Sequence, residues 1–582
     1  MCGIAGELNL KNKISFNKAI NPTLEHRGPD NSNYLRLKKN LYFYHTRLKI
    51  IDLSDDSNQP IVSQNSRYTI IFNGEFYNFQ DIKKKLIKKG YNFKTTGDTE
   101  VFLNGFVEWG TNFFNKVNGI FATSIFDKKL NCIYFARDFI GVKPLYYFFD
   151  DYSFAFSSEL KTLLKIKKSK CNLNEKLLNE FLYYKYITGK ETLVKNIFKF
   201  DPGKVYKIDL NNKKIKLSQS KYYNFNEKSN DDSIKEATGK TNFLLKKSIN
   251  LQLQSDANLG IQLSGGVDST LITELACEQQ NIQYLFFSSF KNFKKDESNY
   301  AYKVEKKLNI TLKSISLTKS FFDKNFKKAI YYLDEPLNHP HSLAIYQISK
   351  KARNNVSVLL SGEGADELFF GYERYNSLFK KNISTMDLVK NGAFLRDDAD
   401  LELFNKFKKV KHQVDPHENR IKLFNRINVD NIYKKFQLFE TQTHLQSLLL
   451  RSDKMMMANS IEARVPFLDK ELYDYSINLS DKIKKNKINK IILKKILKQK
   501  LYSDNFIFRK KIGYIVPFNN WVKTKKNFEK DLITENLLNF FDKKKLKDLS
   551  FQLSQKKNIY SNAKMFWLMK NLNNFINIFE LN

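Results

Sequence analysis

The spacing of apolar residues changes near residue 230, and this change constrains the fold more than any other feature of the chain. Before it, short runs rich in β-branched and aromatic residues, such as 120–127 and 132–137, alternate with Gly and Asn turns. After it, apolar strands at 259–263 and 356–360 alternate with segments of helical spacing. The first part is therefore predicted to be dominated by sheets, and the second is predicted to be an α/β domain with a doubly wound parallel sheet.

This change divides the chain into three predicted segments. Residues 2–205 form the first domain, 206–235 form connecting strands and a linker, and 236–582 form the second domain. The linker is placed in the polar stretch 226–233, after a Pro-Gly turn and two hairpin strands. From residue 401 onward the spacing is mostly helical. A length of 582 residues suits two to four domains at roughly 150 residues each.

The chain is strongly basic. Lys and Arg number 98 against 61 Asp and Glu, which leaves a net charge of +37. Such a charge attracts polyanions at low salt, so RNA is considered as a partner. Lysines that are spread over a whole surface are more often a solvated face, and Lys is used heavily throughout this chain. A nucleic-acid partner is therefore not expected.

The cysteines and the apolar runs bear on where the protein works. Cys2, Cys132, Cys171 and Cys277 are far apart and form no CxxC pair, so neither a disulfide framework nor a zinc site is predicted. No uncharged run is long enough to span a membrane, and the start MCGIAGELNLK lacks the basic and apolar regions of a leader peptide. We expect a soluble, cytoplasmic protein without a membrane partner.

Cys2 follows the initiator Met1 and precedes the small Gly3. Removal of Met1 would leave a cysteine whose own α-amine has a pKa near 7.7–8.0. One residue then carries a nucleophilic thiol and a base that takes its proton, which is the arrangement of N-terminal nucleophiles. By itself the position is a weak signal, because a second-position cysteine also occurs by accident or as an acylation site.

Three polar clusters, each beside an apolar strand, support the nucleophile: Arg47, then Asn73-Gly74-Glu75, then Asp98. We expect them to bind an amino acid with a side-chain amide, holding its carboxylate on Arg47 and its ammonium on Glu75 or Asp98. The Asn73 side chain and the Gly74 amide would stabilise the oxyanion. The structural alternative is that Arg47 and Asp98 form ion pairs and that Asn73-Gly74 is only a hairpin turn.

These residues stand in the motifs MCGIAG, EHRGPD, RLKIID, NGEFYN, GDTE and ARDFIGVKPLYY. Together the motifs resemble the class II glutamine amidotransferase domain, a family that hydrolyses glutamine to glutamate and ammonia. The resemblance implies an α+β N-terminal-nucleophile sandwich (αββα) with Cys2 as the nucleophile, and it puts the polar clusters at the glutamine site. One departure is Phe139, where relatives usually carry a polar or basic residue.

The text LGIQLSGGVDST puts a Ser-Gly-Gly turn between an apolar strand and an apolar helix. Backbone N–H groups and the helix N-terminus then face a common point, where a phosphate fits. Asp268 would repel a phosphate unless it held Mg²⁺. The turn is not the G-x-x-x-x-G-K-[ST] loop, so γ-phosphate transfer is not implied. The residues predicted to bind this phosphate, which the resemblance described below assigns to ATP, are Leu263, Ser264, Gly265, Gly266, Asp268 and Ser269.

A second apolar strand runs into SGEGADE, where three carboxylates crowd one short loop. Carboxylates this close repel one another unless a cation or a cationic substrate neutralises them. We therefore expect Asp268 and Asp366 to share a Mg²⁺-pyrophosphate group. Ser361 and Gly362, at the start of this loop, are predicted to lie beside the nucleotide.

SGGVDST resembles the signature of the N-type ATP pyrophosphatases. Joined to SGEGADE, LDEP and SDKMMMANSIEARVPFLD, it resembles the glutamine-hydrolysing asparagine synthetases over nearly the whole chain. The resemblance implies that ATP adenylates the β-carboxylate of aspartate and that ammonia from glutamine, passing through an internal channel, displaces AMP. It puts Glu363 where an acid assists ammonia attack, Ser288 beside the adenine, and Lys511, in FRKKIGYIVPF, on the reacting phosphate.

Two departures from this family leave the acceptor open. Residues 370–372 read FGY where relatives commonly have GGY, and 338–341 read NHPH in place of a more usual acidic and serine-rich text. Some relatives amidate sugar carboxylates or other acids, so an amidotransferase of that kind is the main alternative. A tRNA-modifying adenylating enzyme is a weaker alternative, since it would not need Cys2. The oligomeric state is open, and a homodimer is one possibility.

Overall fold

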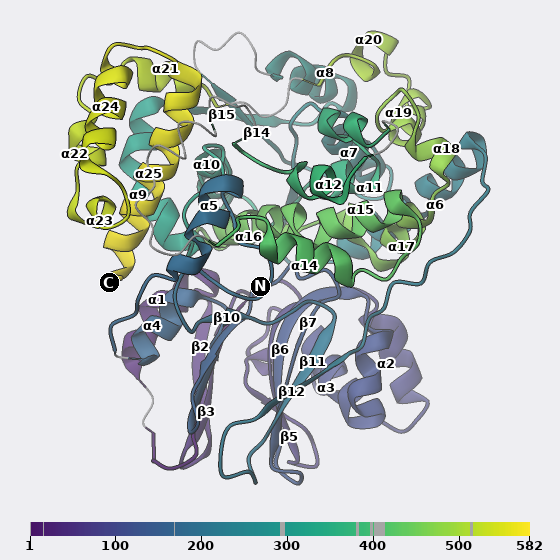
Figure 1. Ribbon diagram of the computed structural model, residues 1–582. Helices are drawn as coiled ribbons and strands as arrows, with labels where there is room; N and C mark the ends of the chain where they lie inside the picture. The colour runs from purple at the N-terminus through teal and green to yellow at the C-terminus, as the bar shows by residue number, and fades with distance from the viewer. Residues whose placement is uncertain are drawn as a thin grey trace.

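The computed structural model describes residues 2–14, 17–167, 169–290, 297–379, 383–395, 400, 414–511 and 516–582. Figure 1 shows two parts: a lower part built around two sheets, and an upper, helix-rich part around a smaller sheet. The N-terminus lies between the two parts, and the C-terminus ends the helices on the left. Of the predicted helical stretch, 401–413 lies outside the described residues.

Two six-stranded antiparallel sheets build the lower part, with strand orders β10-β8-β9-β1-β3-β2 and β12-β11-β7-β6-β5-β4. The first contains β1 (Cys2–Asn9), β2 (Asn31–Lys38), β3 (Leu41–Arg47), β8 (Tyr146–Phe149), β9 (Ser153–Ser157) and β10 (Phe198–Lys199). The second contains β4 (Ile61–Val62), β5 (Tyr68–Phe76), β6 (Gly119–Asp127), β7 (Cys132–Arg137), β11 (Lys204–Asp209) and β12 (Leu217–Lys221).

Apolar side chains of the two sheets meet in a common core. Ile4 and Phe156 come from the first sheet and Ile71 from the second, and all are buried in one cluster. Phe72, the next residue in β5, points the other way, into a cluster with α2 (Phe79–Ile87) and α3 (Asp98–Trp109). On the outer side of the first sheet, α1 (Asn21–Leu24), α4 (Leu160–Lys167) and α5 (Leu178–Tyr184) pack in a further cluster. These layers confirm the predicted αββα sandwich.

The hairpin β11–β12 completes the second sheet. β11 pairs with both β7 and β12, so this sheet extends to Lys221, although the sequence suggested that 206–235 only connects the two domains. Residues 222–233 carry no helix or strand. Helix α6 (Ile234–Gln252) then begins at Ser233, whose side chain forms a capping box with Glu236.

The upper part contains a five-stranded parallel sheet with the order β15-β14-β13-β16-β17. Its strands are β13 (Leu259–Gln262), β14 (Leu285–Phe290), β15 (Leu312–Leu317), β16 (Val358–Leu360) and β17 (Glu462–Arg464). Neighbouring residues Phe286 and Phe287 of β14 pack in two different clusters, because strand side chains alternate between faces. Helices cover both faces, which confirms the doubly wound sheet.

One face of the parallel sheet is covered by a group that includes α6, α7 (Val267–Cys277) and α19 (Ile491–Lys498). The other face is covered by a group that includes α9 (Lys319–Leu333), α10 (Ser342–Ala352) and α16 (His444–Met457). Near the first group lie α8 (Ser298–Leu308), α11 (Ala365–Leu368), α12 (Thr385–Lys390), α14 (Glu418–Arg426), α15 (Ile432–Gln442), α17 (Lys470–Asn478), α18 (Asp481–Lys484) and α20 (Asp504–Ile507).

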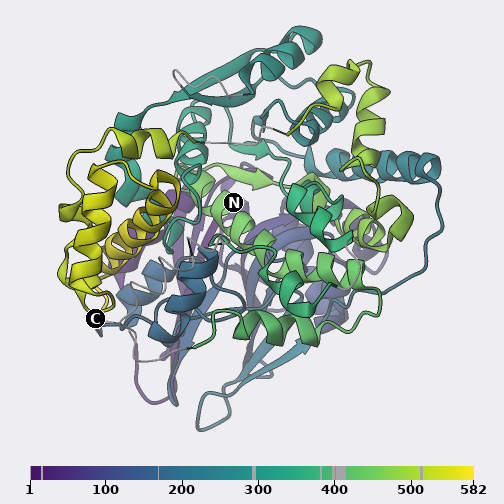
Figure 2. The same ribbon diagram turned by 45° about the horizontal axis from the view of Figure 1, so that its top comes forward.

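The C-terminal helices gather at one side of the molecule, as Figures 1 and 2 show in yellow. They are α21 (Phe518–Lys523), α22 (Glu529–Leu532), α23 (Glu535–Leu538), α24 (Lys543–Ser554) and α25 (Ile559–Phe579). Helix α25 packs on α9 and buries Trp567 against Phe326. None of the described helices combines the length and the apolar character needed to span a membrane.

Candidate active sites

The first candidate site forms where β1, β3, β5 and α3 meet. Strand pairing places Cys2 directly opposite Arg47, because these residues are partners in the β1–β3 register. Gly74 and Glu75 lie in β5, and Asp98 is the first residue of α3. All five of these residues line one small cavity of about 30 Å³. The structure therefore brings together the residues that the sequence predicted for a glutamine site.

Asn73 and Gly74 lie inside β5, so the hairpin-turn alternative is wrong. The Cys2 backbone N–H donates to Asn73 Oδ1 at 3.1 Å, which ties the nucleophile's own backbone to this strand. A Cβ atom on Gly74 would lie 2.0 Å from the backbone oxygen of Ile120. Only glycine fits at that position, and its amide stays beside the thiol.

Arg47 is buried, at 3% exposure, and its guanidinium is held by neutral acceptors. It donates to the backbone oxygens of Asp52 and Ser54 and to Asn58 Oδ1 at 2.9 Å. Asp98 accepts from the Phe76 backbone N–H at 2.9 Å. Within the described residues neither side chain has an ion-pair partner, so the predicted alternative of structural ion pairs is not observed. Both charges remain available to a zwitterionic ligand.

Burial sets the protonation of this site. It raises the pKa of the Cys2 thiol, while the chain's N-terminal amine, the Leu48 amide and Arg47 oppose that rise. Burial also raises the pKa of Asp98 to about 6 and holds the pKa of Glu75 well above its ordinary value. A cationic ligand would favour the ionised forms of both acids.

The upper part of the molecule contacts one acid of the first site. Arg464, at the end of β17, lies 3.4 Å from Glu75 Oε2 and donates to Glu462 Oε1 at 2.6 Å. The arginine and Glu462 are fully buried and Glu75 almost so. This contact was not predicted from the sequence, because SIEARVPFLD was taken only as a motif that resembles the asparagine synthetases.

A buried ion network joins the two parts beside this site. Arg27 contacts Glu159 at 2.7 Å within the lower part and Asp453 of α16 at 2.9 Å. Lys454 contacts Glu159 at 2.8 Å and Asp334 at 2.6 Å. All of these side chains are fully buried. Removing one partner from such a network costs about 3–5 kcal/mol, so the two parts are held in a fixed relation.

The second candidate site lies at the carboxyl ends of β13 and β16, where the order of the parallel strands reverses. Such switch points are where open α/β sheets bind ligands. Loop 263–266 follows β13; the Ser264 N–H donates to Ser269 Oγ at 3.0 Å, and Leu263 is buried at the strand end. A Cβ on Gly362, in the loop after β16, would lie 3.1 Å from the Cβ of Asp268, so the two loops touch.

Asp268 and Asp366 face each other across a lysine. Lys490 Nζ lies 2.6 Å from Asp268 Oδ2 and 2.6 Å from Asp366 Oδ1, and Lys511 Nζ lies 2.7 Å from Asp366 Oδ2. Burial raises the pKa of Asp268. Burial acts in the same direction on Asp366, but the two lysines hold the pKa of that carboxyl below its usual range. The predicted pairing of the carboxylates is therefore present, with an ammonium group between them.

Glu363 stands in a pocket of basic and aromatic residues. Its Oε1 accepts from Arg451 Nη2 at 2.9 Å, and Arg451 also contacts His341. The His339 and His341 rings stack with centroids 4.7 Å apart. Burial raises the pKa of Glu363 and lowers that of both histidines, so the neutral imidazoles leave Arg451 as the charged partner of this acid.

Several buried polar atoms of the second site have no partner in the described part of the chain: Ser288 Oγ, Ser361 Oγ and Asp268 Oδ1. Such atoms cost free energy unless a ligand or water satisfies them, so they fit a bound nucleotide and a cation. The described residues hold no group of three His, Cys, Asp or Glu able to bind a metal alone. A cation here would need further ligands from the phosphates.

Two residues of the second site were not predicted from the sequence. Lys490 lies among many lysines of the 481–500 stretch, and nothing in the text distinguishes it. Arg509 was noticed only as a neighbour of Lys511. Its guanidinium donates to the Gly265 backbone oxygen at 2.8 Å, contacts Glu297 at 3.0 Å and so holds the glycine-rich loop. Residues 512–515, the rest of that basic motif, lie outside the described residues.

Comparison with known proteins agrees with this arrangement. Residues 1–223 match the family "Glutamine amidotransferase domain", and residues 240–576 match the family "Asparagine synthase". Asparagine synthetase [glutamine-hydrolyzing] 1 of Bacillus subtilis is 30% identical over 90% of this chain and 89% of its own length. Asparagine synthetase [glutamine-hydrolyzing] 3 of the same organism is 28% identical over 94% of this chain and 93% of its own.

Solved structures give a weaker likeness. A structure titled "allosteric regulatory enzyme of purine biosynthesis" covers 54% of this chain and 80% of its own, at 13% identity and a TM-score of 0.30. A likeness of that size carries no argument about function. The two sequence families cover both parts of the molecule, each with its own site. The chain belongs to the asparagine synthase family and is a glutamine-hydrolysing ligase with an amidotransferase domain and a synthase domain.

Proposed function

We propose that the protein is an asparagine synthetase: it transfers ammonia from glutamine to the β-carboxylate of aspartate, which ATP has activated as an adenylate. The products are asparagine, glutamate, AMP and pyrophosphate. The observation that carries the proposal is the presence of two candidate sites in one chain. A thiol cavity with unpaired charges for an amino acid is joined by buried contacts to a pair of carboxylates at a nucleotide-type switch point.

At the first site, each residue has a distinct role. After loss of Met1 the Cys2 amine takes the thiol proton, and the thiolate attacks the glutamine side-chain amide. Arg47 binds the α-carboxylate of glutamine, while Glu75 and Asp98 accept its ammonium group. Asn73 and the Gly74 amide donate to the oxyanion that forms on the amide carbon. The contact of Asn73 with the Cys2 backbone supports this role.

At the second site, the loop 263–266 binds the ATP phosphates, and Ser288, Ser361 and Gly362 lie beside the nucleoside. Mg²⁺ would be held by Asp268 and Asp366 together with phosphate oxygens, and it would neutralise the charge of the pyrophosphate that leaves. Lys511, which contacts Asp366 at 2.7 Å, would stabilise the charge on the α-phosphate. The Lys511 Nζ contacts Asp366 in this structure, so bound ATP would replace Asp366 as a partner of that ammonium group.

Glu363 is proposed to accept a proton from ammonia as it attacks the adenylate. Burial raises the pKa of this acid, which suits a group that takes a proton near neutral pH. Ammonia would reach it from the first site through the interface that Glu75 and Arg464 share. The fully buried network around Arg27 and Lys454 lies in the same interface between the two parts.

A second acceptor is favoured by one observation. The stacked His339 and His341, the Lys185 ammonium at 3.2 Å from His339, and Arg451 place several cation or donor groups around Glu363. These donors suit the hydroxyl and carboxylate oxygens of a sugar acid as well as the carboxylates of aspartate, so a sugar carboxylate or another acid is the alternative acceptor.

One experiment tests the function directly. Glutamine labelled with ¹⁵N in its side-chain amide is incubated with ATP, Mg²⁺ and a panel of carboxylic acids, and the products are analysed by mass spectrometry. We expect ¹⁵N in asparagine, with equal amounts of AMP and pyrophosphate. Label in another amide, with aspartate left unchanged, would establish the alternative acceptor. Label only in free ammonium under every condition would refute an ATP-dependent amidotransferase.

A further inference from the structure

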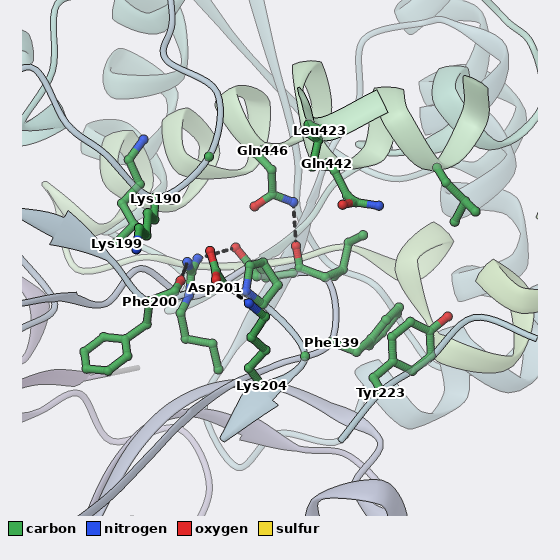
Figure 3. Close-up of a pocket in the computed structure, with 18 of the residues that line it drawn as sticks. Phe139, Lys190, Lys199, Phe200, Asp201, Lys204, Tyr223, Leu423, Gln442 and Gln446 are labelled. Carbon is green, nitrogen blue, oxygen red and sulfur yellow. Dashed lines mark hydrogen bonds and ion pairs between the residues drawn. The ribbon is translucent and has the colours of Figure 1, made fainter. Parts of the chain in front are cut away.

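A cleft of about 750 Å³ lies between the two parts of the molecule (Figure 3), and its lining includes none of the proposed catalytic residues. One wall comes from residues 137–146 and 186–204 of the lower part, and from the end of β12 with the residues that follow it, up to 225. The opposite wall comes from α14, α15 and α16 of the upper part. This volume is in the range of sites that take small-molecule ligands, about 300–1,000 Å³.

Charge in the cleft is unbalanced. Its charged side chains, apart from the buried Arg137, are Lys190, Lys199, Lys204, Lys221, Arg426, Asp201 and Glu335. Both acids are already paired, Glu335 with Lys199 at 2.9 Å and Asp201 with Lys204 at 2.6 Å. Lys190, Lys221 and Arg426 have no carboxylate within ion-pair distance among the described residues. Three cations in a shared cleft favour an anionic ligand, most of all a phosphate.

The opposite end of the cleft is aromatic. The rings of Phe139 and Tyr223 lie 4.9 Å apart, and Phe139 also contacts the ring of Tyr473. Figure 3 shows Phe139 and Tyr223 at one end, Lys190 and Lys199 at the other, and Gln442 and Gln446 above the space between them. Gln446 is fixed by a 2.7 Å hydrogen bond to the Ile140 backbone oxygen, whereas the Gln442 side chain is exposed.

We propose that this cleft is a second ligand site, which binds a nucleoside phosphate. The phosphate would lie against Lys190, the base would stack on Phe139 and Tyr223, and Gln442 would hydrogen-bond the edge of the base, while Lys221 and Arg426 add to the positive charge of the cleft. An inorganic anion alone would fill a small share of the volume and leave the aromatic end unused. A ligand here contacts both parts of the molecule, so its binding is sensitive to their arrangement.

Calorimetric titration of the full chain with AMP, GMP, CMP and UMP, one at a time, tests the proposal. We expect at least one of them to bind saturably. Lys190→Glu should weaken that binding about tenfold, because it removes a cation and adds a repelling carboxylate. Phe139→Leu keeps apolar volume but removes the flat ring, and it should weaken binding about fivefold. Lys547→Glu, an exposed lysine of α24, is the matched control and should bind as the wild type does.

Glutamine hydrolysis by each variant reports whether it is folded, because neither Lys190 nor Phe139 belongs to that site. Competition with excess ATP and Mg²⁺ separates the cleft from the ATP loop. Binding that is displaced by ATP and unchanged in Lys190→Glu would place the nucleotide at the ATP loop and overturn the proposal. Absence of binding for all four nucleotides up to about 1 mM would do so as well. Sensitivity to Lys190→Glu without sensitivity to Phe139→Leu would reject the nucleoside and leave only an anion site.

Discussion

Lys490 offers the sharpest test of the second site. The Lys490→Met variant keeps most of the side-chain length and removes the ammonium group that lies 2.6 Å from both Asp268 and Asp366. Lys490 is 6% exposed and the two acids are 18% and 16% exposed, so water screens the carboxylates poorly once the cation is gone. Breaking a buried ion pair by removing one partner costs about 3–5 kcal/mol. We expect a loss near the lower end of that range, about 3 kcal/mol, because the acids keep some contact with water.

The size of the thermal shift follows from the size of the domain. The synthase match covers residues 240–576. At roughly 2.1 cal/mol/K per residue, its unfolding entropy is about 0.7 kcal/mol/K, so a 3 kcal/mol loss lowers the midpoint by about 4 °C. Scanning calorimetry in EDTA measures this shift for the transition assigned to the synthase domain. Millimolar Mg²⁺ should restore most of the loss, because a divalent cation then takes the place of the ammonium group.

Lys495→Met is the matched control, since Lys495 is an exposed lysine on neighbouring α19. It should leave both the midpoint and its magnesium dependence unchanged. Lys490→Met should hydrolyse glutamine normally and lose ATP-dependent amide formation. If Lys490→Met melts with the wild type in EDTA and keeps full synthetic activity, the reasoning about the paired carboxylates is wrong.

Three further predictions concern the first site. Cys2→Ala should abolish glutamine-dependent synthesis and keep synthesis from added ammonium, measured as pyrophosphate release; loss of both activities would mean that the sites are not separable. Asp98 has a pKa of about 6, so the KM for glutamine should rise as pH falls below 6 and the carboxylate is protonated, and Asp98→Asn should show a high KM without this dependence. Folding raises the pKa of Asp98, so the free energy that this acid contributes to folding is fully present below its ordinary pKa of 3.8 and is lost as the pH rises through 6. Denaturant titrations of Asp98→Asn should not show this decrease in unfolding free energy between pH 3.8 and 6. Gly74→Ala places a Cβ 2.0 Å from the Ile120 oxygen, so it should cost more than about 2 kcal/mol in unfolding free energy and abolish glutamine hydrolysis; an unaltered denaturation curve would contradict the close approach.

The sequence predicted the layers of the fold well where the apolar pattern is regular. Strand 132–137 agrees with β7, and the helix expected at 271–277 lies within α7, which begins four residues earlier at the glycine-rich turn. The two strands of the hairpin after residue 203 were predicted, but their place in the second sheet of the lower part was not. Its partner, β7, lies more than sixty residues earlier, and local spacing says nothing about such a pairing.

For both sites, the sequence predicted only the residues that stand in recognisable motifs. Cys2, Arg47 and Asp98 were identified by residue type, but their convergence depends on the β1–β3 register and on where α3 begins, and neither is visible in a linear text. Lys490 could not be selected, because many identical residues surround it and only its left-handed backbone and two carboxylate contacts set it apart. Arg464 was likewise hidden, since its partner Glu75 is remote in sequence.

The contact between Glu75 and Arg464 limits how the two halves of this protein can be recombined. A chimera that takes residues 1–223 from a relative inherits an acid at position 75 whose ion-pair partner lies in β17 of the host chain. Such a graft would need to carry Glu462 and Arg464 along with it, or the transplanted acid would be left buried without its countercharge. A working chimera must therefore exchange residues from both domains together, and not the amidotransferase segment alone.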